Sequence, residues 1–299
     1  MPHTSTRLQQ HSGFTATLIC PQLEPVLAAY QTVFNLEAGA ISTLSSLITD
    51  AWNKPELANK RYTVLRNHAG EPWLRIIELP DATTPIPVNY FGWMALQLGI
   101  NNLSAILPEL VKHDFHIIGE PLFQDLGQQL EIYQCIGPAG EVLYLADNQQ
   151  LCHVLSSSAY RHNNLLMPVL ATSNRQHSAD FYAILSSTAR RYRDSRLTVV
   201  SRALNKSIDS TYPVASIPFG NSSILEINEI KALSSMPSAP QPLPSGLGML
   251  TLNVYDLSLI ANLTYQQIYR IEDDFYQGRR AVLLQGPEGE WVECIEQQM

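Results

Sequence analysis

The sequence predicts an α+β protein built from four βαβββ modules that form two domains. Its 299 residues exceed the roughly 100–200 residues of a single domain. Short segments recur in the same order in both halves, which indicates an internal duplication. Within each half, the pattern of a strand, a helix and further strands occurs twice. We therefore expect one domain of two modules at residues 1–150 and a second domain of two modules at residues 151–299.

The composition indicates a folded protein and argues against two classes of partner. Hydrophobic residues make up 45% of the chain and charged residues 15%, so the apolar side chains suffice for a core. The formal net charge is −8. Nucleic acid and anionic membranes both attract clustered Lys and Arg, so we expect neither as a partner. The longest basic cluster, residues 190–196, is interpreted as a solvated helix face.

The cysteines are scattered and form no CxxC pair: Cys20, Cys135, Cys152 and Cys294. In a chain of this length they predict reduced thiols in a cytoplasmic protein, and neither a disulfide framework nor a zinc site. The N-terminus lacks the charged start and long apolar run of a signal peptide. No stretch reaches the about 18 apolar residues of a transmembrane helix.

Four pairs of matching segments carry the duplication, and the members of each pair are 149 to 156 residues apart. The pairs are residues 23–30 with 175–182, 51–54 with 203–206, 92–96 with 248–252, and 137–141 with 286–290. No single match is specific. Ordered matches at a nearly constant offset are nevertheless hard to produce by chance.

The first half contains the first two modules. Residues 14–20 alternate in polarity and are rich in strand-forming residues, and Pro21 ends this strand. Apolar residues at helical spacing predict helices, and alternating residues predict two further strands. These elements are helices at 23–34 and 41–52 and strands at 62–66 and 73–79. The second module is predicted as a strand at 92–100, a helix at 103–111, and strands at 116–118, 130–136 and 142–146.

The second half repeats this order. The third module is predicted as a strand at 165–172, helices at 178–185 and 196–205, and a strand at 223–227. The fourth module is predicted as a strand at 248–254, a helix at 257–268, and strands at 280–284 and 291–295. The Pro- and Ser-rich run at 236–246 is interpreted as the linker between these two modules.

Three segments resemble a known superfamily. Residues 92–110 (GWMALQLGINNLSAILPEL) resemble the opening of a second module in the glyoxalase/bleomycin-resistance/dioxygenase (vicinal oxygen chelate) superfamily. Residues 137–147 (GPAGEVLYLAD) resemble that module's final hairpin, and residues 73–80 resemble the closing strand of a first module. The resemblance implies four βαβββ modules paired into two glyoxalase-like domains. It does not imply one activity, because this fold hosts isomerases, dioxygenases, fosfomycin-type transferases and drug-sequestering binders.

The metal-using members of that superfamily hold a divalent ion in a cup of strands with two His and one or two Glu. Carried over to this sequence, the histidine positions fall on Thr15, Trp93, Met167 and Met249. The glutamate positions fall on Glu78, Tyr144, Glu226 and Glu293. A thioether or an indole does not replace imidazole as a ligand of Zn, Fe, Ni or Mn. The sequence therefore predicts no metal ligand and no cofactor.

The three glutamates are the candidate catalytic residues. Glu78, Glu226 and Glu293 each lie in an otherwise apolar strand. A carboxylate in a dry cup has a raised pKa that suits it to remove a proton next to a carbonyl group. The alternative is that each glutamate lies on the solvent-facing side of a half-buried strand.

Six further residues are candidates for substrate binding: Thr15, Trp93, Gln97, Tyr144, Met167 and Met249. Trp93 and Tyr144 would form an aromatic wall for a flat or apolar ligand, with the Tyr144 hydroxyl orienting a polar group. Gln97 shares the face of Trp93 if that strand is regular. The alternative for the aromatic residues and the methionines is ordinary core packing.

These observations leave three hypotheses open. In the first, the protein is a metal-independent lyase or isomerase that binds a small, largely apolar organic molecule and uses a Glu as general base. In the second, it is a non-catalytic small-molecule binding protein. In the third, it is a metal-dependent glyoxalase or dioxygenase. The modules of this fold pair edge to edge, and four in one chain can pair internally, so both a monomer and a homodimer remain open.

Overall fold

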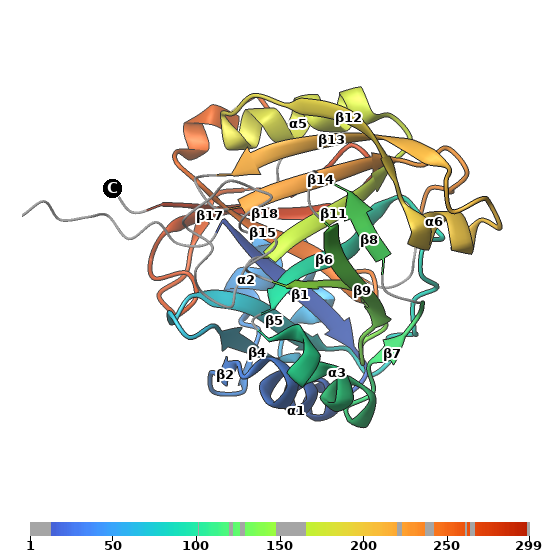
Figure 1. Cartoon of the computed structure of the whole chain (residues 1–299). Coiled ribbons are helices and arrows are strands. Elements are labelled where there is room, and N and C mark those ends of the chain that lie inside the picture. Colours follow the sequence, from blue (N-terminus) through green and yellow to red (C-terminus); the bar gives the residue numbers. More distant parts are fainter. Residues whose placement is uncertain are drawn as a thin grey trace, which may run out of the picture.

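The computed structural model describes residues 13–100, 102–119, 122–125, 129–147, 166–219, 223–236, 242–260, 262–263 and 267–297. These residues form two mixed β-sheets of nine strands each, with helices packed beside them (Figure 1). The predicted α+β class is confirmed. None of the helices in this described part of the chain combines the length and apolar character needed to span a bilayer.

The four modules follow one another along the chain. The first contains β1 (Phe14–Cys20), α1 (Leu23–Phe34), β2 (Glu37–Ala38), β3 (Ser42–Thr43), α2 (Ser46–Ala51), the 3-10 helix η1 (Pro55–Leu57), β4 (Arg61–Arg66) and β5 (Pro72–Glu78). The second contains β6 (Gly92–Ile100), α3 (Leu103–Lys112), β7 (His116–Ile117), β8 (Leu122–Asp125), β9 (Gln129–Ile136) and β10 (Val142–Asp147). The third contains β11 (Leu166–Thr172), α5 (Arg175–Ser186), β12 (Arg191–Arg196), α6 (Thr198–Ala203), β13 (Thr211–Phe219) and β14 (Ser223–Glu229). The fourth contains β15 (Gly246–Val254), the 3-10 helix η2 (Leu257–Ile260), β16 (Tyr269–Arg270), β17 (Arg280–Gln285) and β18 (Trp291–Glu296).

Each sheet combines one module from each half of the sequence. Sheet I joins the first and fourth modules in the order β16-β17-β18-β15-β1-β5-β4-β2, with β3 paired to β4. Sheet II joins the second and third modules in the order β12-β13-β14-β11-β6-β10-β9-β7, with β8 paired to β9. The boundary predicted near residue 150 describes the duplication and does not separate the two sheets. Residues 148–165 around it, and residues 237–241 of the predicted linker, lie outside the described residues.

Three apolar clusters form the core. The central cluster contains residues of both sheets and of α1, α3 and α5. A second cluster covers the opposite face of sheet I and includes Trp52, Tyr269 and Phe275. A third covers the opposite face of sheet II and includes Val200 and Tyr212. We call the second and third faces cup I and cup II, because they correspond to the strand-lined cup that the sequence predicts.

Side chains alternate between the central core and a cup along each strand. In β5, Leu74 and Ile76 belong to the central cluster, whereas Ile77 belongs to the cluster of cup I. Arg75 shares the face of Ile77. This alternation decides which of the predicted site residues can face a ligand.

Two predicted helices differ from the structure. The helix expected at 257–268 is only the short η2, and residues 261 and 264–266 lie outside the described residues. Asp256 accepts a hydrogen bond from the backbone N–H of Ser258 at 2.7 Å, and such a local bond competes with a regular helix. The helix expected at 41–52 begins only at Ser46, because the Ser45 hydroxyl caps it by accepting from the N–H of Ile48.

The basic cluster near residue 190 is a strand and not a helix face. Residues Arg191–Arg196 form β12 at the edge of sheet II, next to β13. Charged side chains are common on edge strands because they prevent pairing with other chains. Pro213 and Pro218 in β13 weaken its strand pattern, which explains why the sequence did not predict this strand.

The cysteines agree with the prediction of reduced thiols where they are described. Cys20, Cys135 and Cys294 are free and buried. Cys152 lies outside the described residues.

Candidate functional site

The two cups carry equivalent positions on equivalent strands. In cup I, Thr17 of β1 pairs with Arg75 of β5, and Thr251 of β15 pairs with Glu293 of β18. In cup II, Val169 of β11 pairs with Glu226 of β14, and Gln97 of β6 pairs with Tyr144 of β10. Arg75 therefore corresponds to Glu226, and Glu293 corresponds to Tyr144. The duplication thus produced two candidate sites with different chemistry.

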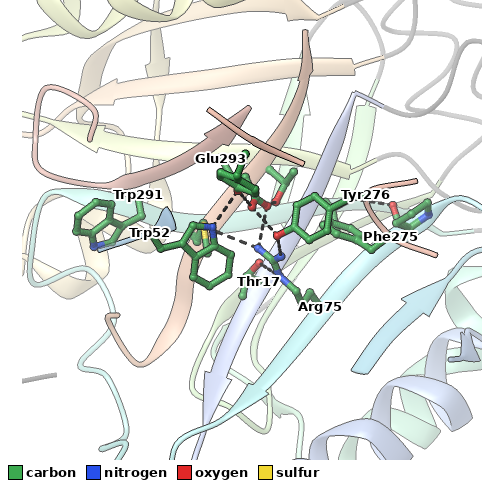
Figure 2. A network of polar contacts seen from close by, with 12 residues as sticks. Thr17, Trp52, Arg75, Phe275, Tyr276, Trp291 and Glu293 are labelled. Carbon is green, nitrogen blue, oxygen red and sulfur yellow. Dashed lines mark hydrogen bonds and ion pairs between the residues drawn. The ribbon is translucent and has the colours of Figure 1, made fainter. Parts of the chain in front are cut away.

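A buried ion pair occupies the centre of cup I. Figure 2 shows Arg75 and Glu293 facing each other, with Nη2 of Arg75 3.0 Å from Oε2 of Glu293. The side chains are only 1% and 0% exposed. Arg75 also donates to the Thr17 hydroxyl at 3.1 Å and to the Tyr276 hydroxyl at 3.0 Å. Its guanidinium lies over the ring of Phe275, 4.9 Å from the ring centre.

Each of the two carboxylate oxygens of Glu293 accepts two hydrogen bonds. Oε2 accepts from Arg75 and from the Thr251 hydroxyl at 2.8 Å. Oε1 accepts from the hydroxyls of Tyr269 and Tyr276, the latter at 2.7 Å. Burial, together with the charge of Glu293, raises the pKa of both tyrosines well above the usual range, so both hydroxyls remain donors. Glu293 is therefore saturated and sealed from solvent, which does not suit a general base.

The other predicted residues of cup I surround this ion pair. Met249 places its sulfur 3.8 Å from Nη2 of Arg75. Thr15 lies opposite Thr251 in the pairing of β1 with β15, and its hydroxyl donates to the Pro72 carbonyl at 3.0 Å.

Glu78 does not face cup I, which corrects the position assigned to it from the sequence. It accepts a hydrogen bond from the N–H of Leu23, the first residue of α1, at 3.2 Å, and it pairs with Arg61 at 2.9 Å. Glu229 has the same role in the third module, where it accepts from the N–H of Arg175 at the start of α5 at 3.0 Å. Glu78 and Glu229 are thus equivalent carboxylates that bind helix N-termini.

Arg75 is the cup residue that the sequence interpretation missed. It stands three positions before Glu78, on the other face of the same strand. The signal was present, because an arginine within the otherwise apolar run WLRIIEL has to be paired if it is buried.

Cup II brings together four of the predicted residues. Met167, Gln97 and Tyr144 are side by side on β11, β6 and β10. Glu226 lies on β14, where it is the strand partner of Val169 of β11. All four predicted side chains are buried. Burial, and next the charge of Glu226, raises the pKa of Tyr144 above its usual range, so its hydroxyl is a proton donor in this cup.

Glu226 has a less complete shell of partners than Glu293. Its Oε2 accepts from Arg193 of the edge strand β12 at 2.6 Å, and Arg193 also binds the Ser216 hydroxyl. Among the described residues, no hydrogen bond to its Oε1 is formed. The Arg193 side chain is 40% exposed, so this ion pair opens toward solvent.

Cup II also contains buried amide groups without partners. Neither the nitrogen nor the oxygen of the Asn228 side chain has a hydrogen-bond partner among the described residues, and Asn228 is fully buried. Its strand neighbours Ala171 and Val214 belong to the apolar cluster of cup II. The side-chain oxygen of Gln134, which pairs with Tyr144, also lacks a described partner. Such orphan groups are rare and each costs about 1–3 kcal/mol.

Trp93 lies outside both cups, contrary to expectation. The pairing of β6 with β11 shifts between Val169 and Leu170, so that Trp93 and Gln97 do not share a face. The indole of Trp93 donates to the Trp291 carbonyl at 2.9 Å and packs edge-on against Tyr182. A bulge of this kind cannot be read from a pattern that assumes a regular strand.

Neither cup offers a ligand set that fits a divalent transition metal. The described residues contain no group of three or more His, Cys, Asp or Glu that could hold an ion. In cup I, the Arg75 guanidinium already occupies the carboxylate of Glu293 and adds a positive charge. In cup II, the one carboxylate pairs with Arg193 and its neighbours are an amide, a phenol and a thioether.

Comparison with solved structures identifies the fold. Glyoxalase I from Zea mays superposes with a TM-score of 0.60 at 12% identity, covering 95% of this chain and 92% of that one. A candidate dioxygenase from Bacillus subtilis subsp. subtilis str. 168 superposes with a TM-score of 0.59 at 10% identity, covering 96% and 86%. No family model and no curated protein matches the sequence. The fold is therefore similar to that of glyoxalase I, in line with the expected glyoxalase-like modules, and at this identity the likeness concerns the fold alone.

Proposed function

We propose that this protein binds a small organic molecule in cup II and that it does so without a metal ion. The observation that carries the proposal is the Asn228 amide, which is buried in cup II with no described partner for its donor or its acceptor. A ligand that supplies both partners would compensate this cost. In cup I, by contrast, Arg75 and Glu293 already form hydrogen bonds with the hydroxyl groups of Thr17, Thr251 and Tyr276.

The side chains of cup II suggest the character of the ligand. Asn228 requires a group with neighbouring donor and acceptor atoms, such as a carboxamide. Tyr144 and Gln97 supply further polar contacts on adjacent strands. Met167 and the apolar cluster of cup II suit the apolar body of such a molecule. This supports a small, largely apolar molecule with one polar edge.

Thermal-shift titration with benzamide tests this proposal. We expect benzamide to raise the melting temperature of the wild type and N,N-dimethylbenzamide, which cannot donate, to have a much smaller effect. Asn228→Leu should lose the response to benzamide, whereas the same change at the exposed Asn262 should preserve it. Equal responses of Asn228→Leu and the wild type, or no response of the wild type to any of several aryl carboxamides, would contradict the proposal.

A second candidate function is metal-independent proton abstraction by Glu226. It is favoured by the arrangement of this carboxylate, because Arg193 holds Oε2 while Oε1 has no hydrogen bond from a described residue. An oxygen left available in this way can accept a proton from a carbon next to a carbonyl group. Glu293 is not proposed as the base, because four donors saturate it.

Deuterium exchange measured by NMR separates catalysis from binding. With acetoacetamide as the probe, wild-type protein should accelerate exchange of the methylene protons in D2O. Glu226→Gln should lose this acceleration while its melting temperature still responds to benzamide. Equal acceleration by both proteins would exclude Glu226 as the base, and no acceleration by the wild type would leave a binding protein without this activity.

A further inference from the structure

A cavity lies at the edge of cup I, in the other sheet from cup II. Its volume is about 110 Å³, and its lining includes Thr15 of β1, Thr251 of β15, the turn between β4 and β5, and the loop before β17. By volume it holds roughly eight water-sized groups. A short organic molecule fits such a space, whereas a drug-sized ligand does not.

Two arginines line this cavity, and neither forms an ion pair among the described residues. Arg66 donates to the Gly70 carbonyl and to the Asp274 backbone carbonyl, both at 2.9 Å. Among the described residues, it forms no ion pair within 4.0 Å. Its guanidinium is thus held in place by neutral oxygens and keeps its positive charge.

Arg279 is held in the same way. It donates to the carbonyls of Tyr276 and Phe275, each at 2.9 Å, and to the side-chain oxygen of Asn253 at 3.2 Å. No described carboxylate forms an ion pair with it. Desolvation by burial lowers the pKa of Arg279, and the charges of Asp273 and Glu293 offset part of this effect.

The remaining walls offset only part of this positive charge. Thr251 and Phe275 of the lining lie in front of the ion pair of cup I, because Thr251 donates to Glu293 at 2.8 Å and the Arg75 guanidinium lies over the Phe275 ring. Arg75 balances the charge of Glu293, so this pair adds no net charge next to the cavity. Glu71 also lines the cavity and carries a negative charge, and its carboxylate accepts from the Asn67 amide at 3.1 Å within the β4–β5 turn. The charged residues of the lining are thus two arginines and one glutamate.

We propose that this cavity binds a short-chain organic carboxylate between Arg66 and Arg279. Guanidinium groups form the strongest and most directional hydrogen bonds that a protein offers to a carboxylate. The ring of Phe275 and the side chain of Ile295 line the same cavity and suit the short apolar part of the molecule. This site is in the other sheet from Asn228 and Glu226, so it does not depend on the function proposed for cup II.

Isothermal titration calorimetry at constant ionic strength tests this site, with lactate and butyrate as probes. Lactamide, which has the shape of lactate without its charge, and inorganic phosphate are the comparison ligands. We expect both carboxylates to bind, lactamide not to bind, and phosphate to bind more weakly because it does not use the apolar wall. Equal binding of lactamide and lactate, tighter binding of phosphate, or no binding of either carboxylate at millimolar concentration would overturn the proposal.

Charge-removing variants locate the binding. Arg66→Gln is the main variant, because Arg66 lies at a strand end where the loss of its bonds does not open the core, and circular dichroism will verify folding. It should weaken lactate binding by about tenfold or more. Arg191→Gln removes the same charge from the edge of sheet II and should bind as the wild type does. Asn228→Leu should also keep lactate binding, which separates this site from cup II. Wild-type affinity in Arg66→Gln would overturn the assignment.

Discussion

Arg75 and Glu293 show how one buried residue can change the use of a site. Two charges without solvent exposure persist only when they are paired and hydrogen-bonded on all sides, and this pair meets that condition through Thr17, Thr251 and Tyr276. Because Arg75 takes up the carboxylate of Glu293, the centre of cup I presents no free carboxylate.

Removing one member of this pair should strongly destabilise the protein. In Arg75→Met, Glu293 would keep its buried charge without a cation, at a cost of about 3–5 kcal/mol in the free energy of unfolding. Urea unfolding followed by circular dichroism measures this quantity. The matched control is Arg190→Met, which breaks an exposed ion pair with Asp180 and should cost about 0–1 kcal/mol. A loss of unfolding free energy in Arg75→Met as small as that in Arg190→Met would show that the buried pair is not essential for stability.

Asn228 should limit the stability of the free protein. Leu has a similar size and needs no hydrogen bonds, so Asn228→Leu should raise the free energy of unfolding by about 1–3 kcal/mol. The same variant should lose benzamide binding, because a group retained at a cost in stability is expected to serve binding. Urea unfolding without ligand provides the measurement. A destabilised variant would mean that Asn228 has partners outside the described residues.

At the scale of elements, two hairpin turns repeat one contact. Glu141 in the turn between β9 and β10 accepts from the Tyr30 hydroxyl of α1 at 2.5 Å, and Glu290 between β17 and β18 accepts from Tyr182 of α5 at 2.6 Å. A Cβ atom at the first glycine of each GPxGE turn, Gly137 or Gly286, would overlap the glutamate carboxylate and displace it from its present position. Two of the repeated segments, the one that contains the helix tyrosine and the one that contains the turn glutamate, thus contact each other in both copies.

These turns should make stability depend on pH. Burial raises the pKa of Glu141 and of Glu290 from the ordinary 4.5 to about 7. The folded state therefore prefers the protonated form, and its advantage is complete below pH 4.5 and lost as the pH rises through 7. Over this window the free energy of unfolding should fall by up to about 3 kcal/mol per carboxyl group.

Urea unfolding at several pH values measures this dependence. In the double variant Glu141→Gln and Glu290→Gln, the side-chain carbonyl can still accept from the tyrosine but cannot ionise, so the slope between pH 4.5 and 7 should flatten. Glu109→Gln, at an exposed carboxylate of α3, should leave the slope as in the wild type. A steep slope in the double variant would assign the dependence to other groups.

The whole molecule is held together by strand pairs that cross between the two sequence halves. Pairing of β1 with β15 completes sheet I, and pairing of β6 with β11 completes sheet II. Each half alone would therefore expose two long unpaired strand edges and half of the central cluster.

Separation of the halves tests this interdependence. Expressed alone, residues 1–150 and residues 151–299 should fail to unfold cooperatively, whereas the two fragments expressed together should form a complex with two complete sheets. Circular dichroism melting and gel filtration distinguish these outcomes, and the intact chain is the control. Two halves that each melt cooperatively as monomers would show that the sheets can form within a half.

Local patterns in the sequence determined the elements that depend on neighbouring residues. Alternation and helical spacing located β1, α1 and β6, and the repeated segments indicated the duplication. Of the glutamate positions assigned from the sequence, Tyr144, Glu226 and Glu293 lie on cup faces of the structure, because side chains alternate along regular strands.

Only the tertiary structure decided how the modules pair and which cup contains a buried ion pair. The pairing of the first module with the fourth depends on contacts between residues more than 200 positions apart, which no local pattern encodes. Glu78 and Arg75 lie three positions apart on opposite faces of β5, and the partner of each, Leu23 for one and Glu293 for the other, comes from outside that strand. The bulge that turns Trp93 away from cup II arises where two strands meet. The sequence thus determined the parts of the fold, whereas long-range packing determined the chemistry of its two cups.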